Sequence, residues 1–360
     1  MPPKIRVLVV DDSAFARSVI AKKLACDDLE IIDFAKDGIE ALEKTKALKP
    51  DVITLDVSMP RMDGLEALER IMAECPTPVV MLSALTGEQT QTTISALEGG
   101  AVDFFLKPSV TTPVGSEGAT EELRDTIRAA ATVTGAKLKG IAGWNRTHRV
   151  TKTAKVQRPN RLNKLIVLGT STGGPKALAD LIPALPGDLP ACILLVQHMP
   201  PMFTKSLADR LNQASEIRVK EAEEGDKIEP GAILLAPGGY HMTLNKNGTI
   251  ALNQNPQVCG VRPAVDVTME SVAPIYRNST LGVVLTGMGA DGTNGAASIK
   301  AAGGQVIVEA ESTCAIYGMP KSVVDAGYAD EVVPLNKMAQ KIAALCGSGS
   351  AASRSRVAVA

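Results

Sequence analysis

The feature that most constrains the fold of this chain is a repeated succession of short β-branched runs and longer helix-period stretches. Between residue 5 and about residue 135, the strand-like runs are Ile5–Val10, Glu30–Ala35, Val52–Asp56, Pro78–Ser83 and Asp103–Lys107. Helix-period stretches such as Ser13–Ala25 and Leu65–Glu74 lie between them. This alternation is typical of parallel βαβ units, whose helices cover both faces of the sheet. We therefore expect an N-terminal α/β domain with a five-stranded parallel sheet.

The same succession returns in the second half of the chain. The strand-like runs there are Leu165–Leu168, Ile193–Gln197, Ala232–Ala236, Leu281–Thr286 and Gln305–Glu309. Helical stretches such as Pro175–Ala184 and Phe203–Asn212 lie among them. The chain has 360 residues, more than the ~250–300 at which a single hydrophobic core stops growing. We therefore expect a second, doubly wound and mainly parallel α/β domain.

A change of composition separates the two halves. The segment Lys137–Lys164 holds nine Lys or Arg residues and no Asp or Glu, with little apolar periodicity, which is typical of a linker. The last residues, GSGSAASRSRVAVA, are low in complexity, as is common for a frayed end. We expect a first domain over 4–136, a basic linker over 137–162, a second domain over 163–346 and a disordered tail over 347–360.

Composition narrows the class of protein. The net charge of −1 gives no overall positive field for nucleic acid. Six cysteines occur without CxxC spacing, which in a long chain favours reduced thiols over disulfides or a zinc site. We found no signal-peptide pattern at the N-terminus and no run near the ~20 apolar residues of a membrane span. We expect a globular, cytoplasmic protein with no membrane insertion.

Polar residues gather where the strands of the first domain end. Asp11 and Asp12 follow the first run and Asp56 closes the third, so three carboxylates meet at the carboxyl edge of the sheet, where parallel sheets bind ligands. Clustered carboxylates are neutralised by a hard cation such as Mg²⁺. Ser83 and Lys107 end the fourth and fifth runs at the same edge. The set fits a phosphoryl group on Asp56, with the metal and Lys107 stabilising its oxygens.

A single aspartate after a strand is more often a helix cap or a solvated turn residue, and Asp12, which precedes a helix, is open to that interpretation. The combination is more specific. The chain carries, in order, the pair Asp11 and Asp12, then Asp56 followed shortly by the motif MPRMDG, then Ser83 and the motif KP that begins at Lys107. This order resembles the receiver domain of two-component response regulators over roughly residues 4–130. The resemblance implies that Asp56 accepts phosphate from a histidine kinase.

The same resemblance implies supporting roles around that aspartate. The Mg²⁺ ligands would be Asp11, Asp12, Asp56 and the backbone carbonyl of Ser58. The residues that contact or sense the phosphoryl group would be Ser83, Lys107 and, as the switch aromatic, Phe105.

In the second domain, the segment LIVLGTSTGGPKAL predicts a strand, a glycine-rich turn and a helix. Pro175 suits the first helical turn, where its missing N–H costs nothing. Ser171 lies in the turn, facing unpaired backbone N–H groups and the positive end of a helix, which favour a developing negative charge. Gly169, Gly173 and Gly174 allow a sharp bend. Ser171 is therefore the candidate nucleophile.

A serine nucleophile needs a base, and the chain has three histidines. His148 lies in the basic segment, His241 follows a turn, and His198 ends the strong run ILLVQH. Its strand-end position places His198 on the same edge as Ser171, so we assign it as the base. The run LGVVLTGMGADG supplies Asp291, after a glycine-rich bend, as the carboxylate that orients this histidine.

The separate motifs leave alternatives open. GTSTG matches the nucleophile-elbow pattern GxSxG, but the order Ser171, His198, Asp291 differs from the Ser, Asp, His order of α/β-hydrolases. GTSTGG can also be compared with the dinucleotide fingerprint GxGxxG, although Ser171 replaces its second glycine. Taken alone, His198 is better explained as a capped strand end, and Asp291 is equally a turn residue.

Four motifs together are more informative. GTSTGGP, VQHMP, APGGYHM and LTGMGADG, across roughly residues 163–346, resemble the catalytic domain of chemotaxis protein-glutamate methylesterases, the CheB family. The resemblance implies that Ser171 is the nucleophile, His198 the general base and Asp291 its orienting partner. Thr172 and Met288 fall within the matched motifs and would support the site. Backbone N–H groups near Met288 and Gly289 are candidates for an oxyanion hole.

The implied activity is hydrolysis of glutamate γ-methyl esters on the cytoplasmic helices of chemoreceptors, with release of methanol. The family also deamidates certain receptor glutamines to glutamate. The resemblance further implies that phosphorylation releases an inhibition by the receiver, and that the esterase site needs no cofactor.

The competing interpretation is a receiver fused to a nucleotide-binding or nucleic-acid-binding output module. Its best support is the acid-free segment Lys137–Lys164, which could contact phosphates. A solvated linker explains that segment equally well, and the second domain shows no helix-turn-helix pattern. We therefore expect no nucleic-acid partner.

Overall fold

The computed structural model describes residues 3–84, 87–107, 117–135, 137–138, 159 and 161–347. The chain divides into two compact units, residues 1–144 and 145–360. Most of the predicted linker and nearly all of the predicted tail lie outside the described residues, so the domain limits stay predictions. Within the described part, no helix has the length and apolar character needed to cross a membrane.

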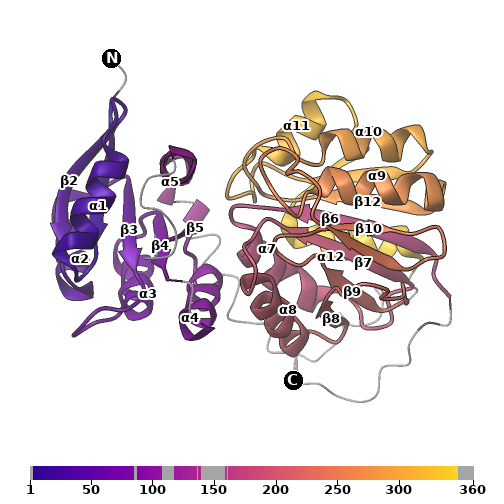
Figure 1. Ribbon diagram of the computed structural model, residues 1–360, viewed down its shortest axis with the longest axis horizontal. Coiled ribbons are helices and arrows are strands. Elements are labelled where there is room, and N and C mark those ends of the chain that lie inside the picture. The colour runs from indigo at the N-terminus through magenta and orange to yellow at the C-terminus, as the bar shows by residue number, and fades with distance from the viewer. Residues whose placement is uncertain are drawn as a thin grey trace, which may run out of the picture. The chain divides into compact units, whose positions relative to one another are not determined.

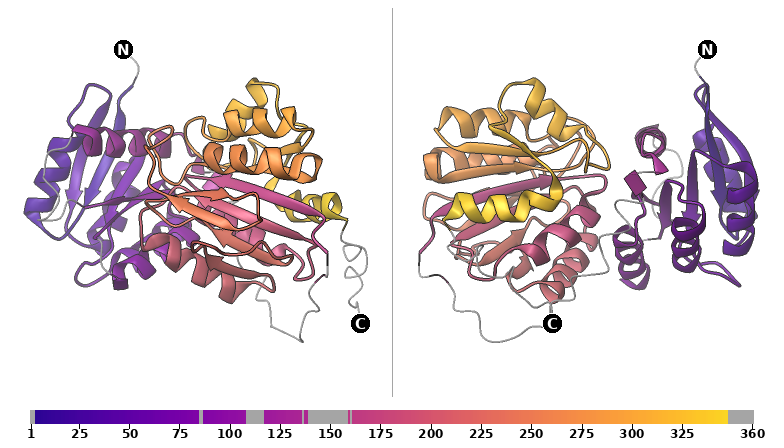
Figure 2. Two further views of the ribbon diagram at one scale, coloured as in Figure 1. Left: turned by 45° about the vertical axis from the view of Figure 1, so that its right-hand side comes forward. Right: turned by 180° about the vertical axis from the view of Figure 1, so that it is seen from behind.

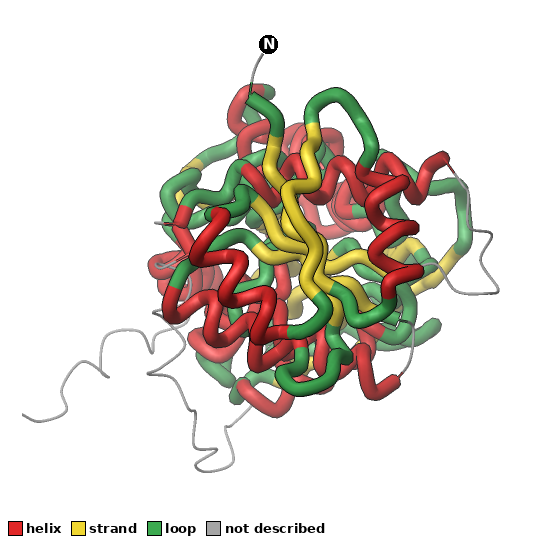
Figure 3. The backbone as a smooth tube through the Cα atoms, turned by 90° about the vertical axis from the view of Figure 1, so that its left-hand side faces the viewer, coloured by secondary structure: helices red, strands yellow, loops and turns green. Residues whose placement is uncertain are grey.

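The N-terminal unit contains a five-stranded, fully parallel sheet in the order β2-β1-β3-β4-β5. Its strands are β1 (Ile5–Val10), β2 (Leu29–Ala35), β3 (Val52–Asp56), β4 (Val79–Ser83) and β5 (Asp103–Leu106). Its helices are α1 (Ala14–Leu24), α2 (Gly38–Leu48), α3 (Gly64–Glu74), α4 (Gly87–Glu98) and α5 (Glu117–Ala131). Helix α1 packs with α5 on one face, and α3 packs with both α2 and α4 on the other (Figures 1 and 3). The predicted fold class is confirmed, and each strand ends within one residue of its prediction.

The local sequence explains these elements. Strands β3 and β4 are buried along their whole length, as continuous apolar runs in a two-sided parallel sheet should be. The first three helices begin at polar N-caps, whose side chains accept backbone N–H groups of the first turn. These caps are Ser13, Asp37 and Asp63. Since Ser13 caps α1, the alternative role of Asp12 as that helix cap is not needed.

The C-terminal unit contains a seven-stranded sheet in the order β14-β13-β12-β6-β7-β9-β8, with every neighbouring pair parallel. The strands are β6 (Lys164–Thr170), β7 (Ala191–Gln197), β8 (Arg218–Glu221), β9 (Ala232–Leu235), β12 (Thr280–Val284), β13 (Gln305–Glu309) and β14 (Glu331–Val333). Strands β10 (His241–Leu244) and β11 (Ile250–Asn253) form a separate antiparallel pair.

Helices cover both faces of this second sheet. They are α7 (Gly174–Leu181), α8 (Phe203–Ala214), α9 (Val265–Tyr276), α10 (Thr293–Ala301), α11 (Met319–Asp325) and α12 (Leu335–Cys346). Helix α10 packs with α9 and α11 on one face, and α7 packs with α8 and α12 on the other (Figure 2). The predicted doubly wound α/β fold is therefore confirmed.

Two predicted elements end two or three residues earlier than expected. The strand predicted over Leu281–Thr286 ends at Val284, because the chain turns there toward the following glycine-rich loop. The helix predicted over Pro175–Ala184 is α7, followed by a 3₁₀ turn over Ile182–Ala184 that contains a proline. Strands β8, β10, β11 and β14 were not predicted, because they have three or four residues each and half-polar sequences.

Each sheet has a switch point, on the two sides of which strands are added in opposite directions. In the N-terminal unit this point lies between β1 and β3, and in the C-terminal unit between β6 and β12. Open parallel sheets bind ligands outside the carboxyl ends of the strands at such a switch point. The predicted phosphorylation site and the predicted nucleophile therefore each lie where the topology favours a ligand.

Candidate active and phosphorylation sites

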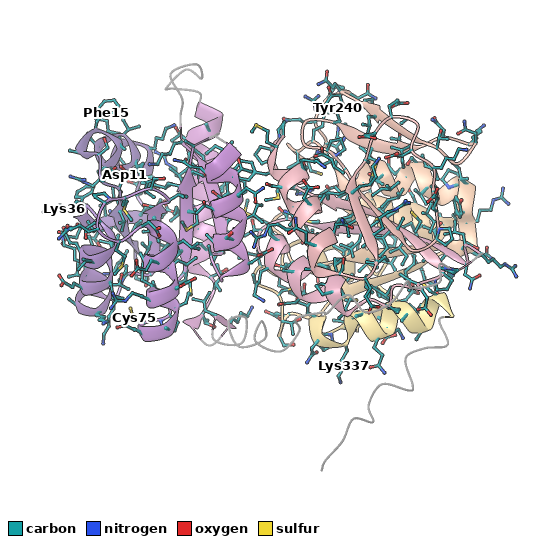
Figure 4. The ribbon with its side chains drawn as sticks, turned by 90° about the horizontal axis from the view of Figure 1, so that it is seen from below. Asp11, Phe15, Lys36, Cys75, Tyr240 and Lys337 are labelled. Carbon is teal, nitrogen blue, oxygen red and sulfur yellow. The ribbon has the colours of Figure 1, made fainter. Side chains whose placement is uncertain are left out.

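Three charged side chains meet at the carboxyl edge of the N-terminal sheet. Asp11 follows β1, Asp56 ends β3, and Lys107 follows β5. The Nζ atom of Lys107 lies 2.7 Å from Asp11 Oδ2 and 2.7 Å from Asp56 Oδ1. Both aspartates are buried. In Figure 4, Asp11 lies toward one end of this unit, and Cys75, which follows the last turn of α3, lies toward the other end. The predicted grouping of these three residues is thus present.

The same edge has the donor set of a divalent-cation site. Asp11, Asp12 and Asp56 each offer a carboxylate oxygen, and these oxygens lie within 4.8 Å of one another. All three are hard oxygen ligands, which Mg²⁺ prefers. The backbone N–H of Ser58 hydrogen-bonds the Asp56 carboxylate. The residues present therefore fit the predicted metal, while the role of the Ser58 carbonyl stays a prediction.

A close backbone approach fixes the loop after β3. A Cβ atom on Gly64 would lie 2.0 Å from the carbonyl oxygen of Asp56. The N–H of Gly64 donates to the carbonyl of Val57 at 3.0 Å. Only glycine fits this approach, which joins the start of α3 to the end of β3.

Burial and shared charge set the protonation of this group. Burial raises the pKa of Asp56, and the negative charge of Asp11 adds to the rise. The hydrogen bond from Lys107 and its positive charge lower this pKa, but only in part offset the effect of burial. Burial also disfavours the charged form of Lys107, but its bonds to Asp11 and Asp56 outweigh burial and raise its pKa. Both shifts have one physical origin, because two buried carboxylates share a single cation.

Two further predicted residues lie at this edge. Ser83 ends β4 and is fully buried. Its Oγ accepts a hydrogen bond from Thr93 Oγ1 at 2.8 Å and donates to the carbonyl of Ala84 at 3.2 Å. Phe105 in β5 is buried. The Ser83 hydroxyl is therefore bonded to α4 in this structure, and its predicted contact with a phosphoryl group stays untested.

In the C-terminal unit, Ser171 directly follows β6 at the switch point. Its N–H donates to the carbonyl of Thr286, beyond the end of β12, at 3.0 Å. The hydroxyl of Thr286 donates to the carbonyl of Thr172 at 2.9 Å. Gly173 adopts a positive φ of 78°, which glycine tolerates, before α7 begins. The turn that carries the serine is therefore anchored to the loop after β12.

His198 and Asp291 form the second part of this site. His198 follows β7, which lies beside β6, and its N–H donates to the carbonyl of Thr170 at 3.2 Å. Its Nε2 lies 2.8 Å from Asp291 Oδ2. Asp291 is buried, in the loop between β12 and α10. Because Asp291 binds Nε2, the ring nitrogen left for a second partner is Nδ1.

Two backbone N–H groups at the start of α9 hold the Asp291 carboxylate. The N–H of Val265 donates to Oδ2 at 2.6 Å, and the N–H of Asp266 donates to Oδ1 at 2.9 Å. These are charge-assisted bonds at the positive end of a helix. They fix the carboxylate independently of the histidine.

The sequence analysis missed this anchor and the role of Asp266. The buried Asp266 Oδ1 accepts the N–H groups of Gly292 and Gly295 at 2.8 and 2.7 Å, which fixes the loop that carries Asp291. Burial raises the pKa of Asp266, although the N–H of Gly295 opposes the shift. The signal was an acidic residue shortly after Pro263, as in the first turn of a helix.

The loop predicted to form the oxyanion hole passes beside the serine. A Cβ atom on Gly287 would lie 2.8 Å from Ser171 Cβ, so the backbones approach closely there. Met288 and Gly289 follow, and the Met288 side chain is exposed. Their contribution, and that of Thr172, to an oxyanion hole stays a prediction.

His241 does not compete for this site. His241, in β10, is buried, and its Nε2 hydrogen-bonds the carbonyl of Pro256 at 3.1 Å. His148 lies outside the described residues.

Comparison with known proteins identifies both halves of the chain. The family model described as "CheB methylesterase" matches residues 166–342, and that described as "Response regulator receiver domain" matches residues 7–113. A "Protein-glutamate methylesterase/protein-glutamine glutaminase" of Symbiobacterium thermophilum is 48% identical, covering 96% of this chain and 98% of the relative. A protein of the same description from Thermotoga maritima is 47% identical, covering 94% of this chain and 97% of the relative.

A solved structure is similar to the second half. It is the "CheB methylesterase catalytic domain" of Thermotoga maritima, with 50% sequence identity and a TM-score of 0.50. The similarity covers 51% of this chain and 98% of that structure.

The raised pKa of Asp56 predicts a pH-dependent effect of Asp56→Asn. The pKa of this carboxyl group is higher in the folded than in the unfolded state. At pH values above the folded-state pKa, its ionised form therefore lowers the stability of the fold. The penalty is relieved as the pH falls through the folded-state pKa and the group takes up a proton. Since asparagine carries no charge, Asp56→Asn should raise the midpoint of thermal unfolding of the N-terminal unit near neutral pH, and the gain should shrink toward pH 4. Calorimetry of the full chain in the presence of a metal chelator measures this unfolding midpoint at each pH.

The matched control is Asp27→Asn, because Asp27 is exposed on the same unit. Its effect should stay within about 0.5 kcal/mol at both pH values. A gain for Asp56→Asn that grows toward acid pH would contradict the account of this carboxylate.

Proposed function

Because the chain belongs to the CheB family of protein-glutamate methylesterases/protein-glutamine glutaminases, we propose that it is a phosphorylation-controlled serine hydrolase acting through Ser171, His198 and Asp291. The enzyme is a hydrolase with a response regulator receiver domain. Neither matched family is described as a nucleotide-binding or nucleic-acid-binding module, so the competing output module has no support.

The observation that carries the proposed mechanism is the 2.8 Å hydrogen bond between His198 and Asp291. His198 and Ser171 directly follow the paired strands β7 and β6. His198 takes the proton of the Ser171 hydroxyl as its Oγ attacks the ester carbonyl carbon. Asp291, held by backbone N–H groups of α9, fixes the ring orientation and stabilises the imidazolium.

The reaction is balanced in two steps. The tetrahedral oxyanion collapses by breaking the bond to the methoxy group, which leaves as methanol with the proton held by His198. Water, deprotonated by the same histidine, then attacks the acyl-serine ester; the bond to Ser171 Oγ breaks, His198 returns the proton to that oxygen, and the glutamate carboxylate is released. With a glutamine substrate the first leaving group is ammonia, so one site serves both reactions.

The oxyanion needs positive partial charge close to Ser171. Backbone N–H groups at Met288 and Gly289 lie in the loop that passes beside the serine, and Thr172 adjoins it. The N-terminus of α7 begins three residues after the serine and adds its dipole. We assign oxyanion stabilisation to this region.

The receiver supplies control. Asp56 accepts the phosphoryl group from a histidine kinase, and Mg²⁺ held by Asp11, Asp12, Asp56 and the Ser58 carbonyl would neutralise the carboxylates and phosphoryl oxygens. Lys107, already 2.7 Å from Asp56 Oδ1, would move with the new charge. Ser83 would turn from Thr93 toward the phosphoryl group and allow Phe105 to shift.

The partners follow from this chemistry and from the family. The phosphodonor is a chemotaxis histidine kinase, and the substrates are methylated glutamates and certain glutamines of chemoreceptors. We place the reaction in the cytoplasm, where receptor helices and kinase meet, and assign it to adaptation in chemotaxis.

Replacing Ser171 by Ala should abolish methanol release from methylated receptor while leaving the fold intact. In serine hydrolases that loss lowers turnover by up to about 10⁶-fold. Asp291→Asn should cost about 10⁴-fold, because the histidine loses its orienting acceptor. Ser298→Ala, a partly buried serine on α10, is the control and should retain activity. A Ser171→Ala chain within tenfold of the original would end this assignment.

Phosphorylation should raise the activity of the full chain. Mg²⁺ and a small phosphodonor should increase the rate of methanol release by about 5–150-fold, the range of a coupling between two sites. Asp56→Asn should show no response, because it cannot form the acyl phosphate. An equal response of the Asp56→Asn chain would exclude Asp56 as the acceptor.

A further inference from the structure

A buried glutamine closes β7, directly before His198. Gln197 is 2% exposed, in a strand whose sequence, ACILLVQ, is otherwise apolar. Burying an amide is unfavourable unless its polar atoms are hydrogen-bonded. The contacts of this side chain therefore need a physical reason.

The amide nitrogen joins the two catalytic segments. Gln197 Nε2 donates to the backbone carbonyl of Ser171 at 3.0 Å and to that of His198 at 3.1 Å. An amide NH₂ has two protons, and here each has one acceptor. Because both partners are carbonyl oxygens, the amide nitrogen and not its oxygen must face them.

The start of α7 leaves space for this amide. A Cβ atom on Gly174 would lie 2.0 Å from Gln197 Oε1 and 2.5 Å from Thr170 Oγ1. The N–H of Gly174 donates to the same Ser171 carbonyl at 2.8 Å. The last glycine of the GTSTGG turn is thus required by the packing of Gln197.

The amide oxygen makes this arrangement costly for stability. Among the residues that the structure describes, Gln197 Oε1 is buried without a hydrogen-bond partner. An unpaired buried carbonyl oxygen destabilises the folded state and offsets part of the stabilisation that the two hydrogen bonds of the amide nitrogen provide. The net contribution of this amide to stability is therefore reduced, and its two hydrogen bonds matter chiefly for the segments that they join.

The position of the bond suggests its role. The pairing of β6 with β7 ends at Thr170 and Gln197, and beyond these residues both segments leave the sheet. Ser171 and His198 are the next residues, so the Gln197 side chain continues the connection one residue beyond the ladder. Catalytic efficiency depends on such distances, since a misplacement of about 1 Å can cost 10²-fold.

We propose that Gln197 is a positioning residue of the hydrolase, holding the backbones of Ser171 and His198 at their reacting separation through its side-chain amide. Gln197 acts through these two residues and does not touch the substrate. This inference rests on the proposed function and adds a residue to it.

The test replaces Gln197 by Met, which has a similar length but no donor. The full chain, with Mg²⁺ and a small phosphodonor, is assayed by methanol release from a helical peptide carrying one glutamate γ-methyl ester. We expect kcat to fall about 10–100-fold, as for a misplaced catalytic group, with KM within about twofold. The midpoint of thermal unfolding should change little, because removal of the unpaired oxygen offsets the loss of the two hydrogen bonds, and the Ser171 carbonyl still accepts the N–H of Gly174.

The matched control is Cys192→Ala, since Cys192 is fully buried near the other end of the same strand. It should lower the unfolding midpoint and leave kcat unchanged at temperatures where the chain is folded. A kcat for Gln197→Met within twofold of the original would overturn the positioning role. Absence of methanol release by the unaltered chain would instead overturn the proposed function, and this inference with it.

Discussion

Parallel strands end at one edge of their sheet, and this constraint organises both halves of the molecule. At a switch point, two neighbouring strands send their following loops in opposite directions, which leaves space at the edge and directs polar groups into it. Asp11 and Asp56 meet in this way between β1 and β3. Ser171 and the loop toward Asp291 meet between β6 and β12. The apolar strands behind these edges give the rigid support that short-range chemistry requires.

The two edges hold buried carboxylates by different means, in keeping with their proposed tasks. Asp56 shares one lysine with Asp11, and burial raises its pKa, so its charge is incompletely compensated. A cation or a covalent phosphoryl group can then change the balance of the site, which suits a switch. Asp291 instead accepts two backbone N–H groups and a histidine ring, bonds that do not depend on an added ion. That arrangement suits a constant role in orienting a base.

The sequence predicted those parts of the fold and site that depend on local pattern. Apolar runs such as Val52–Asp56 and Gln305–Glu309 coincide with observed strands, because central parallel strands are buried on both faces. The short, half-polar strands β8 and β14 carry too few residues for a periodicity to be recognised. The anchoring of Asp291 by α9, about 25 residues away in the chain, depends on tertiary contact, and the local pattern of an acidic residue in a first helical turn does not indicate the partner.

The central claim is that Ser171 is made nucleophilic by the His198–Asp291 pair, and covalent labelling tests it most directly. A small fluorophosphonate forms a bond from phosphorus to an activated serine Oγ with loss of fluoride, and peptide mass spectrometry locates the adduct. The account predicts one adduct, on Ser171, formed at a rate that falls by orders of magnitude in His198→Ala. Labelling of a different serine, or an equal rate of Ser171 labelling without His198, would contradict it.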